Sequence, residues 1–356
     1  MKVPNEQNEE EISLILGNSN PNFSGVTSTM LQVSAEQRKW VNLRIMGKHH
    51  LTDPDLYISF WDTVRLCRKP LKNGKFRVFH ARRVDEMIQA LILRYLFRCK
   101  LKIVFSSAAQ RKRSGSTVWI TRKMDAVVAV SQRSAGFLAD PPDIVIPHGI
   151  QTHLYQPARN KALAWQALGY GGKIGIGMLG RVRKQKGVHH FVRACIASLP
   201  KYPDVTAVIV GAISSSHREF VEQLKSEVEE AGLSSRIIFT GELPFKQIPQ
   251  IFSALSVVAA LSDNEGFGLT VPEAMSAEAA VLATDAGAWP EIIRQDIDGY
   301  VVPVNASDEI NQKLDVLLSD TKRCETMGKR GRERVLEHYS IEREARQLLE
   351  FFETLR

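Results

Sequence analysis

Short, almost continuously apolar runs alternate with stretches of helical spacing along most of the chain, and this alternation limits the folds that the chain can adopt. Runs without a polar face are typical of parallel strands that helices cover on both sides. The runs of the first half span residues 12–16, 41–46, 56–61, 77–80, 102–106, 126–130 and 144–146. Those of the second half span residues 174–179, 206–210, 237–240, 257–261, 281–284 and 300–302. The pattern predicts an α/β protein with two doubly wound parallel sheets.

The length of 356 residues is sufficient for two such domains with separate cores. We expect a Rossmann-like N-terminal domain over residues 1–150, a linker over 151–172 and a second Rossmann-like domain over 173–340. Ligands of open α/β sheets bind beyond the carboxyl ends of the strands, so the expected site is a cleft that both domains face. The helices expected between the strands include 85–98, 114–123 and 220–231, and a last helix is expected at about 341–355.

Composition excludes several classes of protein. The apolar share of 44% and the charged share of 24% are ordinary for a globular protein. The four cysteines form no CxxC pair, which argues against a zinc site or a disulfide framework and favours a reducing cytosol. The N-terminus lacks the apolar core of a signal peptide, and the apolar stretch 87–97 is short and interrupted by Arg94. We therefore expect a cytoplasmic protein without a membrane span.

The net charge of +8 is distributed unevenly along the chain. Residues 1–150 contain 23 basic and 13 acidic side chains, whereas residues 151–356 contain 24 and 26. The excess is densest over residues 65–133, with 18 basic against 3 acidic side chains. This asymmetry suggests an anionic partner for the first half, although a solvated face without a partner explains the charge alone equally well.

A dehydrogenase would need a glycine fingerprint between an early strand and its helix. The nearest match, Gly175 to Gly180, lies inside an expected strand and is followed by Arg181 and Lys186. We therefore do not expect a nicotinamide cofactor.

The segment 263–275, Asp-Asn-Glu-Gly-Phe-Gly-Leu-Thr-Val-Pro-Glu-Ala-Met, connects an expected strand to a helix that begins near Thr270. Pro272 suits the first turn of that helix, because its missing N–H costs nothing there. The free N–H groups of a helix start, next to the flexible Gly266 and Gly268, favour the binding of anions and hydroxyl groups.

Two carboxylates of this segment, Glu265 and Glu273, can point toward one ligand that lies across the helix start. A carboxylate accepts two hydroxyl hydrogen bonds, which is how proteins hold sugar diols. The helix dipole alone explains Glu273, but it does not explain Glu265, which lies between the strand and the helix beside glycine. The two residues are therefore predicted to bind a sugar or a ribose.

A second segment, Met-Leu-Gly-Arg-Val-Arg-Lys-Gln-Lys-Gly over residues 178–187, follows the first strand of the second domain. Arg181 and Lys186 at a strand-to-helix turn can hold a diphosphate, with help from the helix N-terminus. The pattern of a P-loop is absent. No Asp-x-Asp motif accompanies either segment, so we expect these two cations to replace a metal ion.

Together the two segments resemble glycosyltransferase family 4, the retaining transferases with the two-domain GT-B fold. The resemblance covers nearly all of the second domain and includes residues 237–241 and 284–291. It implies that Arg181 and Lys186 bind the diphosphate of a nucleotide sugar and that Glu273 binds its ribose. It also implies that the last helix, about 341–356, packs back on the first domain. The backbone and side chains expected around the sugar and the base are Glu265, Gly266, Phe267, Gly268, Leu269, Gly241 and Leu243.

The first domain matches the family more loosely. Phe-Ser-Gly-Val-Thr-Ser-Thr over residues 23–29 looks like the family's glycine loop, with Gly25 facing the donor phosphates. His80 ends a strand where the family often has a histidine that contacts the sugar, so we expect His80, Arg181, Lys186 and Glu265 to be the catalytic residues. His148, near the domain junction, is expected to be a cleft or hinge residue.

The combination of residues 24–29, 80–83, 107–111 and 147–149 is similar to the lipopolysaccharide core mannosyltransferases of alphaproteobacteria. This resemblance implies GDP-mannose as donor, an anionic lipid-linked core oligosaccharide as acceptor, and a peripheral position at the cytoplasmic face of the inner membrane. It implies no cofactor and no nucleic-acid partner. The basic residues expected on the acceptor side are Arg82, Arg83, Arg111, Lys112 and Arg113.

Three alternatives remain open from the residues. The chain could use a UDP-sugar or an ADP-sugar as donor, or it could be a sugar-nucleotide epimerase of the same fold, which needs no acceptor. A basic module that binds nucleic acid or membrane would leave Arg181, Lys186, Glu265 and Glu273 without a use.

Overall fold

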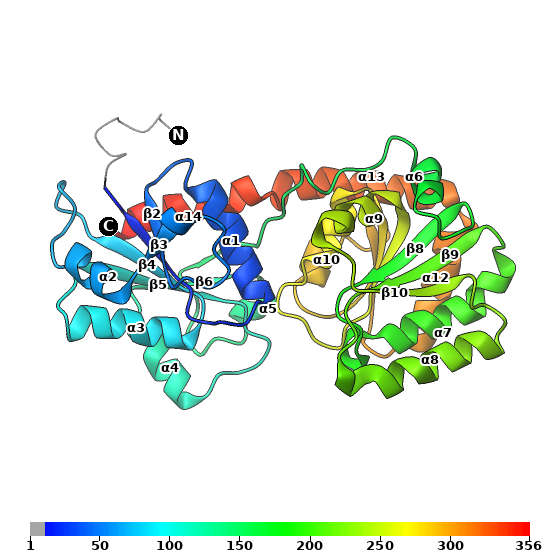
Figure 1. Cartoon of the computed structure of the whole chain (residues 1–356), viewed down its shortest axis with the longest axis horizontal. Coiled ribbons are helices and arrows are strands. Elements are labelled where there is room, and N and C mark those ends of the chain that lie inside the picture. The colour runs from blue at the N-terminus through cyan, green and yellow to red at the C-terminus, as the bar shows by residue number, and fades with distance from the viewer. Residues whose placement is uncertain (1–10) are drawn as a thin grey trace. The chain divides into compact units, whose positions relative to one another are not determined.

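The computed structural model describes residues 11–356 and divides them into two α/β units. Unit 1 contains residues 11–149 and Ile341–Arg356, and unit 2 contains Ile150–Ser340 (Figure 1). The acidic residues 1–10, on which the expectation of no signal peptide rests, lie outside the described residues.

Unit 1 is built on a seven-stranded parallel sheet with the strand order β3-β2-β1-β4-β5-β6-β7. Its strands are β1 Leu14–Gly17, β2 Leu43–Met46, β3 Tyr57–Ile58, β4 Arg77–Ala81, β5 Leu101–Ser107, β6 Ala126–Ala129 and β7 Ile144–Val145. Its helices are α1 Gly25–Gln37, α2 Phe60–Cys67, α3 Val84–Tyr95, α4 Gly115–Thr121, α5 Gln132–Ala135 and α14 Ile341–Leu355.

The strands of unit 1 bury both faces, as their apolar runs require. One core contains Met30 and Val33 of α1 together with Leu348 and Phe352 of α14. The other core contains buried side chains of α2 and α3. The last helix of the chain therefore belongs to the fold of unit 1 rather than to that of unit 2.

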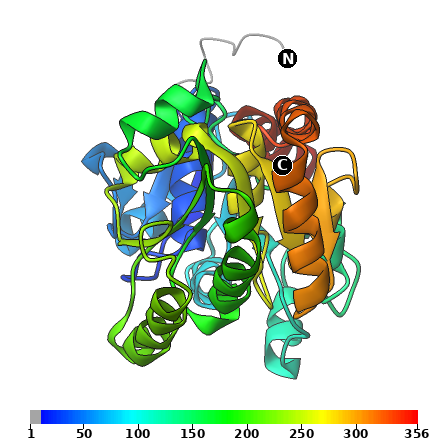
Figure 2. The same cartoon turned by 90° about the vertical axis from the view of Figure 1, so that its right-hand side faces the viewer.

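Unit 2 contains a six-stranded parallel sheet with the order β10-β9-β8-β11-β12-β13. Its strands are β8 Ile174–Leu179, β9 Val205–Val210, β10 Ile237–Gly241, β11 Leu255–Ala260, β12 Ala280–Thr284 and β13 Gly299–Val302. Its helices are α6 Lys161–Ala167, α7 Val188–Ser198, α8 Arg218–Glu230, α9 Ile248–Ala254, α10 Thr270–Ser276, α11 Trp289–Ile292, α12 Ser307–Ser319 and α13 Thr321–His338. Helices α8, α7 and α12 lie side by side over one face of the sheet (Figures 1 and 2).

The predicted fold class is confirmed, because both sheets are parallel and helices cover both of their faces. Two local expectations were wrong. The run 56–61 divides between the two-residue strand β3 and the start of α2, where the Ser59 hydroxyl accepts a hydrogen bond from the N–H of Asp62. The segment 151–172, expected to be a linker, belongs to unit 2 and contains helix α6.

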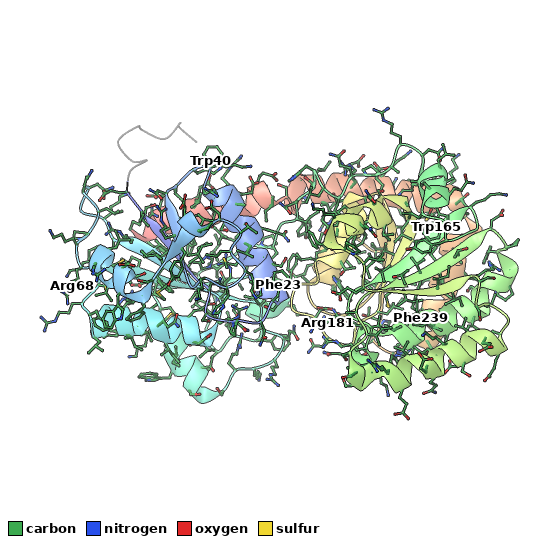
Figure 3. All side chains as sticks on the ribbon, viewed as in Figure 1. Phe23, Trp40, Arg68, Trp165, Arg181 and Phe239 are labelled. Atoms are coloured by element: carbon green, nitrogen blue, oxygen red, sulfur yellow. The ribbon has the colours of Figure 1, made fainter. Side chains whose placement is uncertain are left out.

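The glycines of β8 serve packing, which explains why they resemble a dinucleotide fingerprint without forming one. A Cβ atom on Gly175 would lie 2.2 Å from the ring of Trp165, a fully buried side chain of α6 (Figure 3). The Trp165 indole N–H in turn donates to the carbonyl of Gly171 at 2.7 Å. The glycine therefore allows α6 to pack closely on the strand.

Among residues 11–356, no helix has both the length and the apolar character needed to cross a membrane.

Candidate functional site

The turn from β8 to α7 carries Arg181 and Lys186 and has a conformation that requires glycine at its end. Gly187 has a φ of +73°, and a Cβ atom there would lie 2.0 Å from the carbonyl oxygen of Leu261. The turn is also bonded to the loop after β11, because the N–H of Asp263 donates to the carbonyl of Gln185 at 2.9 Å. Two loops that are distant in the sequence are thus held together at the carboxyl edge of the unit 2 sheet.

Glu265 is positioned by contacts from both of these loops. The Lys186 ammonium forms an ion pair with its carboxylate, and the Ser262 hydroxyl donates to Glu265 Oε1 at 3.0 Å. The Ser262 carbonyl accepts a bond of 2.6 Å from the Thr284 hydroxyl, which fixes the start of the loop to β12. The side chains of Lys186 and Glu265 are 25% and 16% exposed, so the pair is partly shielded from water but accessible to a ligand.

The loop that follows Glu265 depends on Gly268 and Trp289. Gly268 has a φ of +85°, and a Cβ atom there would lie 2.2 Å from the indole nitrogen of Trp289. That nitrogen donates to the Gly268 carbonyl at 2.9 Å. The loop therefore reaches α10 in a single conformation, and no side chain caps the start of α10. The N-cap residue Leu269 therefore offers no side-chain acceptor to the first turn of α10. The anion and hydroxyl site expected at this helix start stays a prediction.

These groups line one hollow on unit 2. Its polar lining includes Arg181, Lys186, Ser262, Glu265 and Thr270, with Trp289 beside them. Arg181 is exposed and has no hydrogen-bond partner among the described residues (Figure 3). Two cations, one carboxylate and two hydroxyl groups around one hollow can bind a ligand that carries both phosphate oxygens and hydroxyl groups.

Glu273 has a different environment from Glu265. Burial raises the pKa of its carboxyl to about 7, while a hydrogen bond with Tyr155 acts in the opposite direction. Burial and the nearby Glu273 also raise the pKa of the Tyr155 hydroxyl. Sequence reasoning missed Tyr155, because nothing local marks a tyrosine of the 151–172 segment as a partner of α10.

The remaining residues predicted around the donor lie near the strand ends of unit 2. Gly241 ends β10 with a φ of +73°, and Leu243 follows it as a half-buried side chain. The side chain of Phe267 is buried, and its ring centroid lies 6.5 Å from that of Tyr339. Only the backbone of Phe267 is therefore placed to contact a ligand in this arrangement.

His80, which was expected to contact the sugar, lies inside unit 1. Its side chain is fully buried, its Nε2 is 2.7 Å from the Ser106 hydroxyl, and its ring meets the ring of Phe352 edge to face. Burial lowers the pKa of His80 well below its ordinary value, and Arg82 and His148 add to this effect. His80 is therefore neutral, and a direct contact with a sugar would require its neighbours to move.

Arg83 is a structural residue rather than a free cation of an acceptor surface. Its guanidinium donates to the Ser24 and Thr27 hydroxyls at 2.9 and 2.8 Å, and to Glu86 at 3.2 Å. It thereby ties the end of β4 to the start of α1. At that helix start, a Cβ atom on Gly25 would have no atom within 4 Å.

Arg82 is largely enclosed, and burial lowers the pKa of its guanidinium. Its Nη1 atom is buried and has no hydrogen-bond partner among the described residues. In contrast, Arg111, Lys112 and Arg113 are all exposed, and their role on the acceptor side stays a prediction.

His148 lies at the end of unit 1 and contacts the last helix. Its Nδ1 is 2.8 Å from Glu344 of α14, and the same carboxylate accepts a bond of 2.8 Å from the N–H of Gly149. These bonds fix α14 to His148 and Gly149, where the first of the two chain segments of unit 1 ends.

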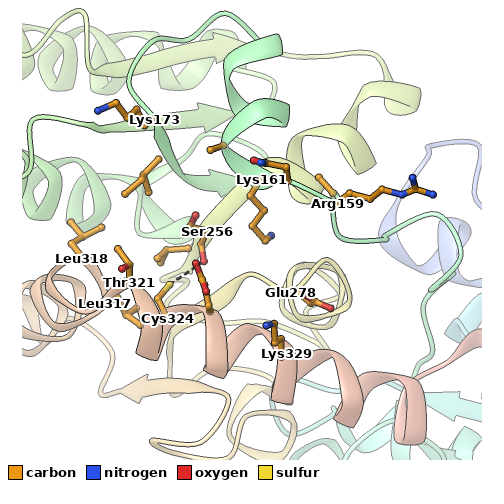
Figure 4. Close-up of a pocket in the computed structure, with 16 residues that line it drawn as sticks. Arg159, Lys161, Lys173, Ser256, Glu278, Leu317, Leu318, Thr321, Cys324 and Lys329 are labelled. Carbon is orange, nitrogen blue, oxygen red and sulfur yellow. Dashed lines mark hydrogen bonds between the residues drawn. The ribbon is translucent and has the colours of Figure 1, made fainter.

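A second cavity, of about 410 Å³, lies at the opposite, amino edge of the unit 2 sheet (Figure 4). The Lys161 ammonium donates there to the carbonyls of Leu255 and Ala277, both at 2.8 Å, and Cys324 Sγ lies 3.4 Å from the Ser256 carbonyl. Burial lowers the pKa of Lys161 to about 8. These bonds give Lys161 a structural role, since it satisfies carbonyl groups at the start of β11 and at the end of α10. The described residues contain no cluster of three or more side chains suited to hold a metal ion.

Comparison with known proteins gives a consistent result. The family model described as "Glycosyl transferases group 1" matches residues 161–334. The chain is 37% identical to the lipopolysaccharide core biosynthesis mannosyltransferase LpcC of Rhizobium leguminosarum bv. viciae, over 94% of each chain. It is 38% identical to the lipopolysaccharide core biosynthesis mannosyltransferase LpsB of Rhizobium meliloti, over 97% of this chain and 98% of that protein.

Two solved structures extend the comparison. The C-terminal domain of a glycosyl transferase group 1 family protein (LpcC) from Francisella tularensis is 42% identical, with a TM-score of 0.53 over 54% of this chain and 99% of that domain. Alr3699/HepE from Anabaena, solved in complex with UDP, has a TM-score of 0.80 at 19% identity, over 97% of this chain and 100% of that one. At that identity the second match shows the fold alone, and it confirms the predicted GT-B fold.

Proposed function

The chain belongs to the group 1 glycosyl transferases, and from this membership we propose that it transfers mannose from GDP-mannose to a lipopolysaccharide core acceptor, with retention of the anomeric configuration. The observation that carries the proposal is the similarity to two proteins named lipopolysaccharide core mannosyltransferases along nearly their whole length. The hollow of unit 2 supports it with the chemistry that a nucleotide sugar needs.

In the proposed mechanism Arg181 and Lys186 bind the diphosphate of the donor. Both cations stabilise the negative charge that develops on the diphosphate as the bond to the sugar breaks, which is an electrostatic role. The leaving diphosphate helps to remove the proton of the acceptor hydroxyl, which attacks from the same face of the sugar. Glu265 accepts hydrogen bonds from sugar hydroxyls and acts neither as a nucleophile nor as half of a glycosidase pair.

The pairing of Lys186 with Glu265 fits this division of roles. Without a donor the two charges satisfy each other, and the Ser262 hydroxyl adds a second contact to Glu265. Phosphate oxygens would compete for Lys186, while sugar hydroxyls would replace the ammonium as donors to Glu265. The donor would then separate the pair without leaving either charge unsatisfied.

A thermal-shift panel with GDP-mannose, UDP-glucose, UDP-GlcNAc and ADP-heptose, run in EDTA, tests both the donor and the absence of a metal. We expect GDP-mannose at a hundredfold excess over its Kd to stabilise the fold by about 2.7 kcal/mol. Stabilisation by a UDP-sugar or ADP-heptose alone would identify a different donor. A shift that appears only after Mn²⁺ or Mg²⁺ is added would contradict the proposed roles of Arg181 and Lys186.

Glu273 is proposed to bind the donor ribose, and this predicts a dependence of donor affinity on pH. The raised pKa of about 7 means that Glu273 is protonated below that pH in the free protein. Its contribution to fold stability is therefore largest at low pH and is lost as the pH rises through about 7. Ribose hydroxyls favour the carboxylate, so donor binding should release a proton and should strengthen as the pH rises.

We expect Glu273→Gln to weaken donor binding by about 2 kcal/mol, because hydrogen bonds to a charged group are lost. Calorimetry in buffers of different ionisation enthalpy should detect proton release with the parent protein near neutral pH and none with the variant. Glu278→Gln, in the loop after α10 and outside the proposed site, serves as a control. Equal proton release by parent and Glu273→Gln would exclude Glu273 as the titrating group.

The acceptor is proposed to be an anionic, lipid-linked core oligosaccharide at the cytoplasmic face of the inner membrane. Arg111, Lys112 and Arg113 are exposed on the more basic half of the chain, where they would attract such an acceptor. Each basic residue near an anionic surface contributes roughly 1 kcal/mol within a Debye length of about 8 Å.

Reversal of these three residues to glutamate should raise the KM for the lipid acceptor at low ionic strength and should leave donor affinity unchanged. The difference between parent and variant should shrink at high salt, because screening removes most of the attraction. Steady-state kinetics with both substrates provides the measurement. Equal acceptor KM values at low ionic strength would show that these residues form only a solvated face.

A further inference from the structure

Helix α3 is apolar on its exposed side as well as on its buried side. Met87, Ala90 and Leu93 are fully buried in the core of unit 1. On the other side Ile88, Ile92, Tyr95 and Leu96 are 42%, 39%, 66% and 71% exposed. Their spacing of four, three and one residues places them on one stripe of the helix and its last turn. A helix with apolar residues all round has one face without a partner.

The neighbouring helices extend this stripe. Trp61 of α2 is 60% exposed, and its ring centroid lies 5.3 Å from that of Phe97, next to Leu96 in the chain. Helix α4 packs beside α3 and carries Trp119, which is 62% exposed. These helices lie on the face of the sheet opposite α1 and α14 (Figure 1). We call Trp61, Ile88, Ile92, Tyr95, Leu96 and Trp119 the α3 patch.

Basic side chains surround the α3 patch. Arg98 follows Leu96 by two residues and is exposed, as are Arg68 and Lys100, whose segments are joined by the bond from Lys100 N–H to the Cys67 carbonyl. The Lys123 ammonium lies 5.3 Å from the centre of the Trp119 ring.

The acidic side chains on and near helices α2, α3 and α4 reduce the positive charge around the α3 patch only a little. Asp62 is paired with Arg65 and Glu86 with Arg83, and Asp125 beyond α4 is paired with Arg94. The exposed Asp85 lies one turn before Ile88, at the far end of α3 from Tyr95 and Leu96. The patch is therefore apolar and aromatic at its centre and positive at its rim.

We propose that the α3 patch seats unit 1 on an anionic lipid bilayer. Tryptophan and tyrosine prefer the interface between water and hydrocarbon, and apolar side chains beside basic ones are typical of helices that lie in this interface. A second copy of the chain is a poorer occupant, because two such patches would bring their positive rims together. The inference rests on the proposed function only for the location of the acceptor, since lipid binding itself needs neither donor nor acceptor.

The test is co-sedimentation of the full chain with vesicles of phosphatidylglycerol and phosphatidylethanolamine, and with vesicles of phosphatidylcholine. The double variant Tyr95→Ser/Leu96→Ser removes the most exposed part of the patch. The matched control Leu163→Ser/Phe245→Ser removes two side chains of unit 2 that are 62% and 63% exposed. Circular dichroism and GDP-mannose binding establish that each variant is folded.

We expect the parent and the control to bind the anionic vesicles and the double variant to partition at least about tenfold less, because two apolar side chains leave the interface. Emission of Trp61 should shift to the blue on binding in the parent, and Trp61→Phe should remove part of the shift. Transfer to a detergent-dispersed acceptor should stay unchanged in the double variant, so loss of lipid binding and failure of the proposed function give different results.

Three outcomes would overturn the proposal. The parent could fail to bind anionic vesicles, or the double variant could bind them as tightly as the parent does. Sedimentation velocity could instead show a dimer of the parent that the double variant loses, which would assign the patch to a contact between two copies.

Discussion

Glu265→Gln should lower turnover about 100-fold or more, since the loss of one preorganised partner of the transition state has this order of effect. The substitution keeps the size of the side chain and removes the charge that pairs with Lys186 and accepts the bond from Ser262. Donor affinity should change less than turnover, because Arg181, Lys186 and Glu273 still bind the nucleotide.

Asp263→Asn is the matched control for Glu265, because Asp263 lies in the same loop with an exposed side chain. It should retain nearly the turnover of the parent. Kinetics at saturating donor, with folding checked by thermal denaturation, make the comparison. Near-normal turnover of Glu265→Gln would exclude the proposed role of this carboxylate.

Lys186→Met should also reduce turnover by a factor on the order of 100 to 1,000, since a cation that stabilises the leaving diphosphate is lost. It should additionally weaken donor binding, because the same ammonium contacts the ground-state diphosphate. In the free protein the variant leaves the partly buried Glu265 without its counter-ion.

Lys184→Met removes an exposed lysine from the same turn and provides the control. Lys186→Arg should restore part of the activity, because charge is kept while the geometry changes. If Lys184→Met and Lys186→Met lose equal activity, the effect arises from the general positive charge of the turn. The proposed specific contact with the diphosphate would then be wrong.

The sequence predicted the strands of unit 2 and the loops that carry the candidate site well, because these parts are local. The apolar runs located all six strands, and the positions of Arg181, Lys186 and Glu265 at strand ends followed from those strands. Parallel strands share one carboxyl edge, so loops after β8 and β11 had to lie close together. The structure adds the contact between Lys186 and Glu265, which strand order alone does not determine.

The features that sequence reasoning missed depend on long-range packing. Tyr155 meets Glu273 because the segment before α6 belongs to unit 2, whereas its polar sequence with Gly, Pro and Asn suggested a linker. His80 lies one residue before the end of β4, and α14 places Phe352 against it, so that it is enclosed. Arg83 looked like a free surface cation because its partners Ser24 and Thr27 lie on a distant helix start.

The exposed side of α3 shows a different limit. From the sequence, residues 87–97 were too short and too interrupted for a membrane span, and that reasoning left their apolar character unexplained. Only the structure separates the side chains that fill the core from those that face solvent. Residues 87–97, which are not suited to span a membrane, therefore contribute to a candidate lipid-binding surface.

The central claim is tested most directly by incubating the full chain with GDP-mannose and a lipopolysaccharide core acceptor that lacks this sugar, followed by mass spectrometry of the acceptor. The account predicts the addition of one hexose, in EDTA, by the parent and by Asp263→Asn, with the product reduced about 100-fold or more in Glu265→Gln. NMR of the product should show the anomeric configuration of the donor. Transfer from a UDP-sugar or ADP-sugar but not from GDP-mannose, or conversion of the donor in the absence of any acceptor, would contradict the account.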